Sequence, residues 1–230
     1  MLVTSQFGQL MNSFVNRSVY TSILTCMVRK KQDPSRTPAA QAVLESAAWL
    51  FYEKGINAVG VDAIAERAGV TKKTLYDQYG SKANLVAEYL TERDHDYYAW
   101  LRKEIEKHTG TDRILAVFDA LDTWMRKRSP KGCAFVHAHG ELLAVPDHPA
   151  HAVIRAEKRW ILRLFVELAE AQGYAQPDAV ATQLVCLLEG ATVLRSISDI
   201  TEAVAQSRTA AAILLDAAAS EPTRAANEQA

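Results

Sequence analysis

Two short helical segments joined by a tight connection constrain this fold more than any other feature of the sequence. The first has apolar residues at the three- and four-residue spacing of one helix face: Val61, Ile64, Ala65 and Ala68. Gly69 follows, and glycine readily adopts the positive φ that ends a helix. In the second segment, Thr71 can cap the helix that begins after it, with Val70 and Leu75 in the positions of a hydrophobic staple. The pattern predicts a helix-turn-helix.

The remaining chain shows the same helical spacing, interrupted at glycine and proline residues. It has no alternating strand pattern, apart from a short ambiguous apolar stretch at residues 133–136. Thr37-Pro38 opens the helix before the two short segments, because proline fits the first helical position. Gly55 ends that helix, and Ser81 caps a long one. The expected helices span residues 38–54, 61–68, 72–79, 82–108, 111–128, 133–145, 149–172, 177–199 and 201–219. The sequence predicts an all-α fold.

Composition and charge exclude several classes of protein. With 49% hydrophobic and 23% charged residues over 230 positions, the chain has the composition of a soluble globular protein. Its net charge of -1 excludes a uniformly basic coat. Residues 29–82 hold nine basic and six acidic side chains, whereas residues 83–230 hold 16 and 21, so only the first part is suited to a polyanion. Three widely spaced cysteines and no long apolar run favour a cytoplasmic location without a membrane span.

The second short helix starts with Lys72 and Lys73, where positive charge opposes the helix dipole by roughly 0.3–1 kcal/mol each. A helix shaped for stability alone would have acidic residues there. Phosphates or guanine edges compensate such lysines when DNA binds, which favours a recognition helix in the major groove. The alternative is a solvated surface turn in which Lys73 pairs with Asp77. The residue types alone leave both interpretations open.

The stretch from Val61 to Lys82 resembles the DNA-binding domain of the tetracycline-repressor (TetR/AcrR) family. The resemblance covers about residues 38–85, and its main motif is Ile-Ala-x-x-Ala-Gly-Val-Thr, then Leu-Tyr, another aromatic residue and Ser-Lys. It implies an N-terminal three-helix bundle with a helix-turn-helix, followed by a larger helical domain for ligand binding and dimerisation. The implied partners are double-stranded operator DNA, an unknown small-molecule inducer and a second copy of the chain. The implied function is a ligand-released repressor of a palindromic operator, with no catalytic residue, metal or cofactor.

The resemblance also implies a set of DNA-contacting residues: Gly60, Val61, Thr71, Lys72, Lys73, Thr74, Tyr76, Tyr79 and Lys82. Residues 71–74 would approach base edges and phosphates, Tyr76 the backbone, and Lys82 a phosphate. This chain departs from the family in two places. It has Val59-Gly60 where a phosphate-binding threonine is common, so the backbone amides of residues 60 and 61 would serve instead. It also has Lys73 where glycine is frequent, which changes the base that is read.

In the larger domain, aromatic residues and two polar ones suggest an inducer pocket: Phe118, Trp124, Phe135, His137, Glu141, Trp160 and Phe165. A packed core with satisfied polar groups is the alternative. The last two helices carry apolar and small residues suited to packing across a dimer axis: Leu184, Leu187, Leu188, Gly190, Ala191, Leu194, Ala203, Ala210, Ala211, Leu214, Leu215 and Ala218. Core packing within one subunit would use the same residues.

Other functions remain as alternatives. One cluster has the residue types of a metal-dependent hydrolase or a metal-sensing pocket: His137, His139 and Glu141, near Cys133, His148 and His151. The hydrolase barrel needs eight strands, and the sequence predicts none after residue 145. A lowered thiol pKa at a helix N-terminus would suit Cys133 to redox sensing, whereas a buried thiol would be inert. The last alternative is a helical interaction protein whose motif no longer binds DNA.

The expected organisation has four parts. Residues 1–36 form a disordered leader and basic arm, with Met27 as an alternative translation start and a genuine tail as the other interpretation. Residues 37–84 form the DNA-binding domain, and residues 85–220 form the ligand-binding and dimerisation domain. Residues 221–230 form a flexible tail.

Overall fold

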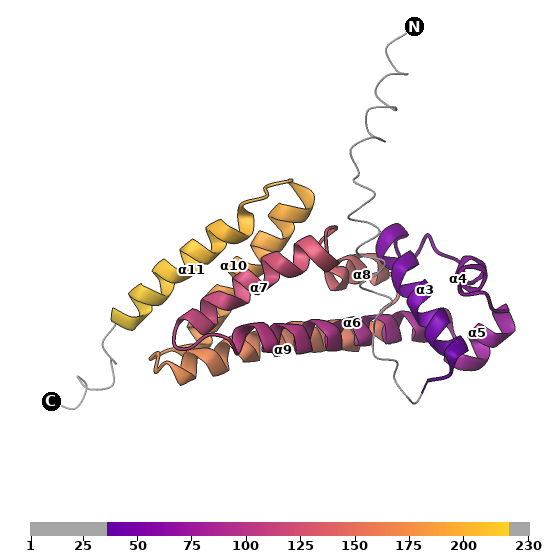
Figure 1. Ribbon diagram of the computed structural model, residues 1–230, viewed down its shortest axis with the longest axis horizontal. Coiled ribbons are helices and arrows are strands. Elements are labelled where there is room, and N and C mark those ends of the chain that lie inside the picture. Colours follow the sequence, from indigo (N-terminus) through magenta and orange to yellow (C-terminus); the bar gives the residue numbers. More distant parts are fainter. Residues whose placement is uncertain (1–35, 221–230) are drawn as a thin grey trace, which may run out of the picture.

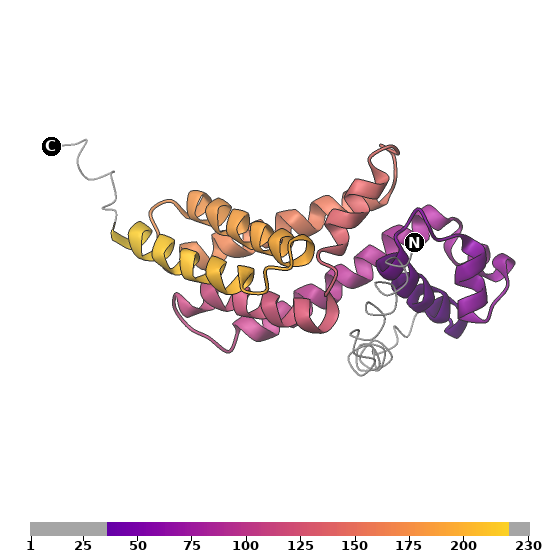
Figure 2. The same ribbon diagram turned by 90° about the horizontal axis from the view of Figure 1, so that it is seen from above.

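Residues 36–220 are described by the structure, a computed structural model, and they form nine helices and no strand. The helices are α3 (Pro38–Lys54), α4 (Val61–Ala68), α5 (Lys72–Tyr79), α6 (Lys82–Ile105), α7 (Asp112–Arg128), α8 (Ala134–Leu142), α9 (Ala150–Ala171), α10 (Pro177–Ile197) and α11 (Ala203–Ser220). The molecule is elongated, with α3, α4 and α5 at one end and α6 running from them into the other helices (Figure 1; Figure 2). The predicted all-α fold is confirmed.

The helix bounds differ from the expected ones mainly at C-terminal ends. α3, α4 and α5 have the expected bounds, but α6 ends at Ile105 rather than at residue 108. The chain there tightens into a short-range turn in which the amide of His108 donates to the carbonyl of Ile105. α8 ends at Leu142 in the same way, because the amide of Val145 donates to the Leu142 carbonyl.

The helix-turn-helix forms through the predicted caps. Thr37 Oγ1 accepts the amide of Ala40 at 3.1 Å, and Thr71 Oγ1 accepts the amide of Thr74 at 3.1 Å. Gly69 takes the left-handed conformation with φ 67°, which lets the chain turn sharply between α4 and α5. Gly69 and the Thr71 cap thus set where α4 ends and where α5 begins.

Two hydrophobic cores share the helices α6 and α9. The first, the head core, joins α3, α4 and α5 to the start of α6, and it also takes in α8 and the first turns of α9. The second, the body core, joins the rest of α6 to α7, α9, α10 and α11. Leu85 and Leu90 of α6 lie in the head core, whereas Leu101 and Ile105 lie in the body core. The head core therefore extends beyond the segment 37–84.

α10 is the one described helix that is long and apolar enough to cross a membrane by length and composition. A core helix of a globular protein passes the same test, and here α10 packs against both α9 and α11. Leu184, Leu188 and Ala191 of its predicted stripe are buried inside the subunit, while Gly190 and Leu194 are exposed. Core packing thus uses part of the stripe predicted for dimerisation.

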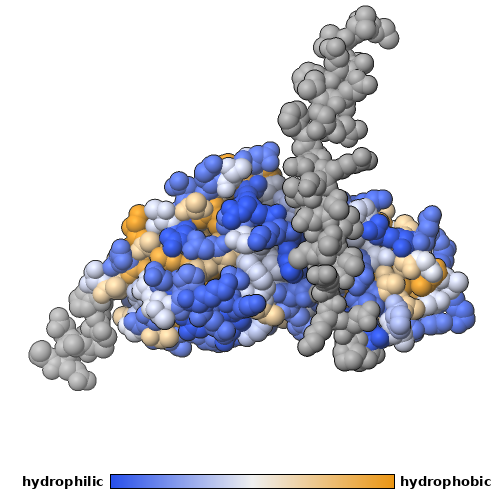
Figure 3. Space-filling view, viewed as in Figure 1, coloured by the Kyte–Doolittle hydropathy of each residue, from blue (hydrophilic) through white to orange (hydrophobic). Residues whose placement is uncertain are grey.

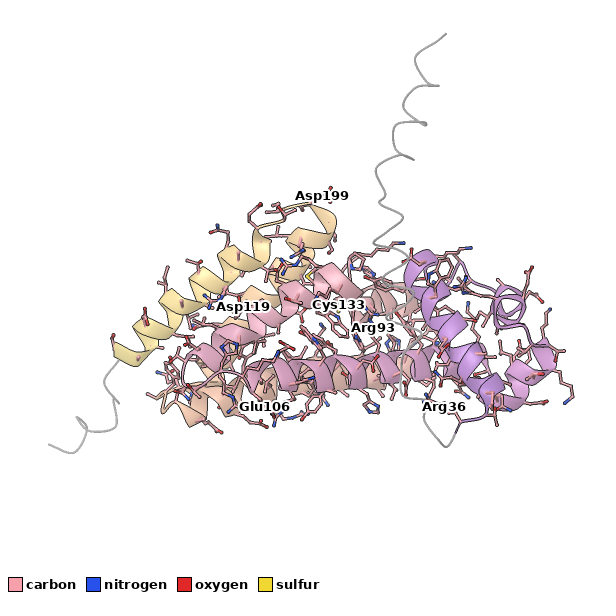
Figure 4. The ribbon with its side chains drawn as sticks, in the orientation of Figure 1. Arg36, Arg93, Glu106, Asp119, Cys133 and Asp199 are labelled. Carbon is pink, nitrogen blue, oxygen red and sulfur yellow. The ribbon has the colours of Figure 1, made fainter. Side chains whose placement is uncertain are left out.

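The leader and tail expectations fall, except for residue 36, outside the described residues. Arg36 itself is partly buried and forms ion pairs with Glu88 and Glu92 of α6, the second at 2.9 Å. The Arg36 side chain therefore ties the start of the described chain to α6 (Figure 4).

Candidate nucleic-acid interface and pocket

The first turn of α5 presents polar side chains to solvent. Thr71, Lys72, Lys73 and Tyr76 are exposed, and Thr74 is partly buried. Leu75, in contrast, is completely buried and holds α5 against the head core. One face of this short helix therefore packs against the head core, and the other is open to solvent.

Both lysines of α5 have acidic neighbours. Lys72 Nζ lies 2.5 Å from Asp62 Oδ1 of α4, and Lys73 Nζ donates to Asp77 Oδ2 at 2.7 Å. The Lys73–Asp77 pair expected for a plain surface turn is therefore present. All four side chains are more than half exposed, and ion pairs of this kind contribute about 0–1 kcal/mol. Such weak pairs are readily exchanged for a phosphate or a base.

Tyr79 and Lys82 have their polar groups bonded inside the head. The Tyr79 hydroxyl donates to the carbonyl of Ala40 at 2.7 Å, and burial raises the pKa of Tyr79 to about 12. Lys82 Nζ donates to the carbonyl of Ile56 at 2.7 Å, and burial lowers the pKa of Lys82. These two predicted DNA contacts thus join α5 and α6 to α3 and to the turn that follows α3.

The start of α4 is open. Gly60 is exposed and occupies the N-cap position of α4 without a side-chain cap, and Val61 is partly buried beside the head core. A Cβ added at Gly60 would meet no atom within 4 Å among the described residues. The backbone amides of residues 60 and 61 are therefore accessible to an anion. This access is needed if they replace the phosphate-binding threonine that is common in the family.

Of the residues predicted to line an inducer pocket, Trp124 and Phe135 line the pocket between α6, α7, α8, α9 and α10. Phe118 and Phe165 instead pack against each other in the body core, fully buried, with ring centroids 6.1 Å apart. Trp160 lies against Tyr97 and donates from Nε1 to Asp94 Oδ1 at 2.6 Å. These three aromatic residues therefore do not line this pocket.

His137 and Glu141 also lie outside the pocket. Neither residue is among those that line it. The Glu141 carboxylate accepts the amides of Ile56 and Asn57 at 2.9 and 2.6 Å. Its backbone carbonyl accepts the Asn57 side-chain amide at 2.9 Å. Glu141 therefore connects α8 to the turn between α3 and α4 and does not line this pocket.

The pocket lies between α6, α7, α8, α9 and α10 and holds about 480 Å³ of space, its open mouth included. Its apolar wall is formed mainly by large side chains: Tyr97, Leu121, Trp124, Met125, Phe135, Ile161 and Leu188. Its polar side includes Arg93, Cys133, Glu157, Lys158 and Glu189. Arg93 of α6 and Cys133 at the start of α8 mark its position in Figure 4.

Sequence reasoning missed Glu157 and Lys158. Glu157 is only 2% exposed and lies three residues after Ile154 and four before Ile161, on the buried stripe of α9. A carboxylate on an apolar stripe is rare unless it is paired. That position was the available signal in the sequence.

One ammonium group serves several acceptors at the pocket. Lys158 Nζ donates to Glu189 Oε1 at 2.6 Å and to Cys133 Sγ at 3.5 Å, and it lies 3.3 Å from Glu157 Oε2. Burial raises the pKa of Glu157 to about 7, against the opposing effect of Lys158. Burial also raises the pKa of the Cys133 thiol. The lowered thiol pKa that redox sensing would need is therefore not found.

Glu157 makes the stability of the protein depend on pH. Its folded-state pKa of about 7 lies above the ordinary value of 4.5, so the folded protein holds this proton more tightly than the unfolded chain. The free energy of unfolding then falls as pH rises from about 4.5 to 7. We expect the Tm of the wild type to fall by about 3 °C or more, relative to Glu157→Gln, between about pH 5 and pH 8. Thermal unfolding curves check this, and parallel curves for the two proteins would contradict it.

No group of three metal-ligating side chains lies in a metal-binding arrangement within residues 36–220. The rings of His139 and His151 have centroids 6.0 Å apart and contact each other edge to face, as do those of His148 and His151. His151 Nε2 lies 3.0 Å from the carbonyl of Val145. These contacts hold the connection between α8 and α9.

A second link joins the pocket to the head. Ser129 and Gly132 form part of the pocket wall, and the Tyr52 hydroxyl of α3 lies 3.4 Å from Ser129 Oγ and 3.3 Å from the Gly132 carbonyl. The same hydroxyl accepts the amide of Lys131 at 2.9 Å. Arg93 donates to Ser129 Oγ at 2.8 Å. A change in the pocket wall therefore reaches α3 through direct hydrogen bonds as well as through α6.

Comparison with known proteins identifies relatives of this arrangement. Residues 43–89 match the family described as bacterial regulatory proteins, tetR family. A tetR transcriptional regulator from Streptomyces avermitilis is 30% identical, with 80% of this chain and 99% of that one covered and a TM-score of 0.67. A TetR-family transcriptional regulator from Streptomyces coelicolor is 28% identical, with 79% and 96% covered and a TM-score of 0.73.

Curated relatives match over a shorter segment. The transcriptional repressor BdcR of Escherichia coli is 38% identical over 72 residues, which are 29% of this chain and 36% of BdcR. The chain thus spans only about a third of this curated relative. The two Streptomyces structures, in contrast, each cover about four fifths of this chain.

Proposed function

Because the chain belongs to the tetR family of bacterial regulatory proteins and is a DNA-binding transcriptional regulator, we propose that it is a ligand-released repressor. In this proposal it binds a palindromic operator in the cytoplasm as a homodimer, and it has no enzymatic activity. Residues 37–84 read the DNA, and residues 85–220 bind the ligand and form the dimer. Binding of a small molecule in the pocket releases the operator.

The exposed lysine pair at the start of α5 is the observation that carries the proposal. Lys72 and Lys73 stand on a helix whose other face is fixed by Leu75, so their position is set by the fold. Within residues 36–220, their ion pairs with Asp62 and Asp77 are exposed and weak. Docked in a major groove, these lysines exchange their carboxylate partners for phosphates and base edges. Thr71, Thr74, Tyr76 and the start of α4 complete the proposed contact surface.

The outer surface of α10 and α11 supports dimerisation. Several large apolar side chains there are exposed in the single chain: Val193, Leu194, Ile197 and Ile213. Figure 3 shows hydrophobic residues gathered along α11 on this side of the molecule. An exposed apolar patch on a folded chain is costly to leave in water. A contact across a two-fold axis would bury this patch on both subunits. Two copies of α5 then read two half-sites about one DNA turn apart.

Release of DNA requires a ligand that binds two arrangements of head and body with different affinity. α6 and the turn around Ser129 both join the pocket to the head. A ligand that moves Trp124 or the Ser129–Gly132 wall changes the position of α3 and therefore of α5. The ligand favours a spacing of the two heads that no longer matches the operator.

Substitution of the lysines tests the DNA face. With an operator selected from a randomised duplex pool, Lys73→Ala should cost roughly 1–3 kcal/mol on the best site and relax the preference at one base position. Lys72→Ala should weaken all duplexes similarly and lower the slope of affinity against salt by about 1. Binding is measured by mobility shift at several salt concentrations.

Lys103→Ala is the matched control, because Lys103 is exposed near the far end of α6. It should bind like the wild type. A purified protein that is monomeric and selects no duplex from the pool at low salt would refute the proposal and favour a helical interaction protein. If both α5 variants bind like the wild type, the DNA face lies elsewhere.

A further inference from the structure

The pocket contains a buried carboxylate oxygen without a hydrogen bond. Glu157 Oε2 is one of two buried side-chain nitrogen or oxygen atoms without a hydrogen-bond partner within residues 36–220. Lys158 lies 3.3 Å from it but donates to Glu189 at the shorter distance of 2.6 Å. A buried acceptor left in this state is costly, and unsatisfied buried polar groups tend to mark sites where a partner is missing.

The cations at the pocket already have partners. Lys158 is held by the two carboxylates. Arg93 donates to the Arg128 carbonyl and to Ser129 Oγ, and its guanidinium lies 4.5 Å from the centroid of the Tyr52 ring. The unfilled capacity of the site is therefore that of an acceptor, which selects a ligand with a hydrogen-bond donor rather than a ligand with a carboxylate.

The walls around this acceptor suit an aromatic ring. Tyr97 and Trp124 lie with ring centroids 5.0 Å apart at a tilt of 53°, and Met125 and Phe135 also line the pocket. A flat ligand ring gains contact area and edge-to-face interactions among such side chains. A cationic nitrogen beside it is attracted by the negative faces of the same rings.

We propose that the pocket binds a small arylalkylamine, whose protonated nitrogen donates to Glu157 Oε2 while its ring packs against Tyr97, Trp124 and Met125. This inference rests on the proposed function and deepens it by naming the chemical class of the inducer. An alcohol of the same skeleton lacks the positive charge, and a carboxylate of the same skeleton is repelled by Glu157 and Glu189. The raised pKa of Glu157 agrees with this assignment, because burial disfavours the charged carboxylate and an added cation offsets that cost.

Three probes with one skeleton test the assignment by calorimetry on the full chain: phenylbutylamine, phenylbutanol and phenylbutanoate. The amine should bind at least about tenfold more tightly than either of the others, the factor expected for one charge-assisted hydrogen bond. In Glu157→Gln the affinity for the amine should fall to the affinity for the alcohol. The affinity for the alcohol itself should change by less than about twofold. Glu170→Gln, the same substitution on the exposed side of α9, should leave all three affinities unchanged.

Equal affinities, preference for the alcohol or the carboxylate, no binding of any probe, or an unchanged amine affinity in Glu157→Gln would each overturn the assignment. The comparison of the three probes on the wild-type protein tests the assignment even if the variant does not fold. Operator binding is measured separately by mobility shift. A protein that binds the operator but shows no amine preference refutes only this assignment, whereas amine preference without DNA selection refutes only the proposed function.

Discussion

Replacing Leu75 by alanine is expected to lower the free energy of unfolding by about 2–5 kcal/mol and to abolish specific DNA binding. Leu75 is the one completely buried residue of α5, and it joins that helix to the head core. The cavity left by alanine removes the main contact that orients the exposed face. Denaturant unfolding and mobility shift measure the two effects.

Tyr76→Ala is the comparison that separates stability from recognition. Tyr76 follows Leu75 on the same helix and is 44% exposed, so its loss should change the free energy of unfolding by less than about 1 kcal/mol. DNA affinity should still fall, because Tyr76 belongs to the proposed contact surface. A Leu75→Ala protein as stable as the wild type would show that α5 is held by other contacts.

Gly132→Ala is expected to destabilise the protein by about 2–4 kcal/mol. Gly132 has φ +98°, a conformation that alanine rarely adopts, and an added Cβ would lie 2.7 Å from both Cβ and Oγ of Ser196. Because Gly132 also accepts from Tyr52 and lines the pocket, the shift needed to relieve this contact disturbs both. Thermal unfolding and ligand calorimetry measure the loss.

Gly140→Ala provides the opposite result from the same substitution. Gly140 lies within α8, and a Cβ there meets no atom within 4 Å among the described residues. Alanine favours the helix over glycine by about 0.5–1 kcal/mol, so this variant should be slightly more stable than the wild type. If both glycine variants behave alike, the strain assigned to Gly132 is absent.

Local signals were sufficient to predict the helices. Thr37, Thr71 and Gly69 act within one turn of their own position, so their effects could be derived from neighbouring residues alone. The same holds for Leu75, whose place on the inward face follows from helical spacing. The helix ends that were misplaced are those where the chain continues as a tight turn, which has the same hydrogen-bonding groups and similar residues.

The pocket could be predicted only in part, because its lining depends on how five helices are rotated against one another. Helical spacing places Phe118 and Phe165 inward but does not say whether they meet each other or a cavity. The rotation of α8 turns Glu141 toward the head, and no local signal specifies that rotation. Glu157 is a common helix residue, and its importance appears only once the surrounding helices bury it.

The unbroken course of α6 through both cores has a geometric consequence. A helix of 24 residues is about 36 Å long, so a tilt of about 5° about one end moves the other end by about 3 Å. Since Leu101 and Ile105 fix one end and Leu85 and Leu90 the other, a small repacking of the body is enlarged along this lever. In a dimer both α6 helices would tilt. Displacements too small to unfold either core would then change the spacing of the two α5 helices, so that it no longer matches the spacing of the major grooves.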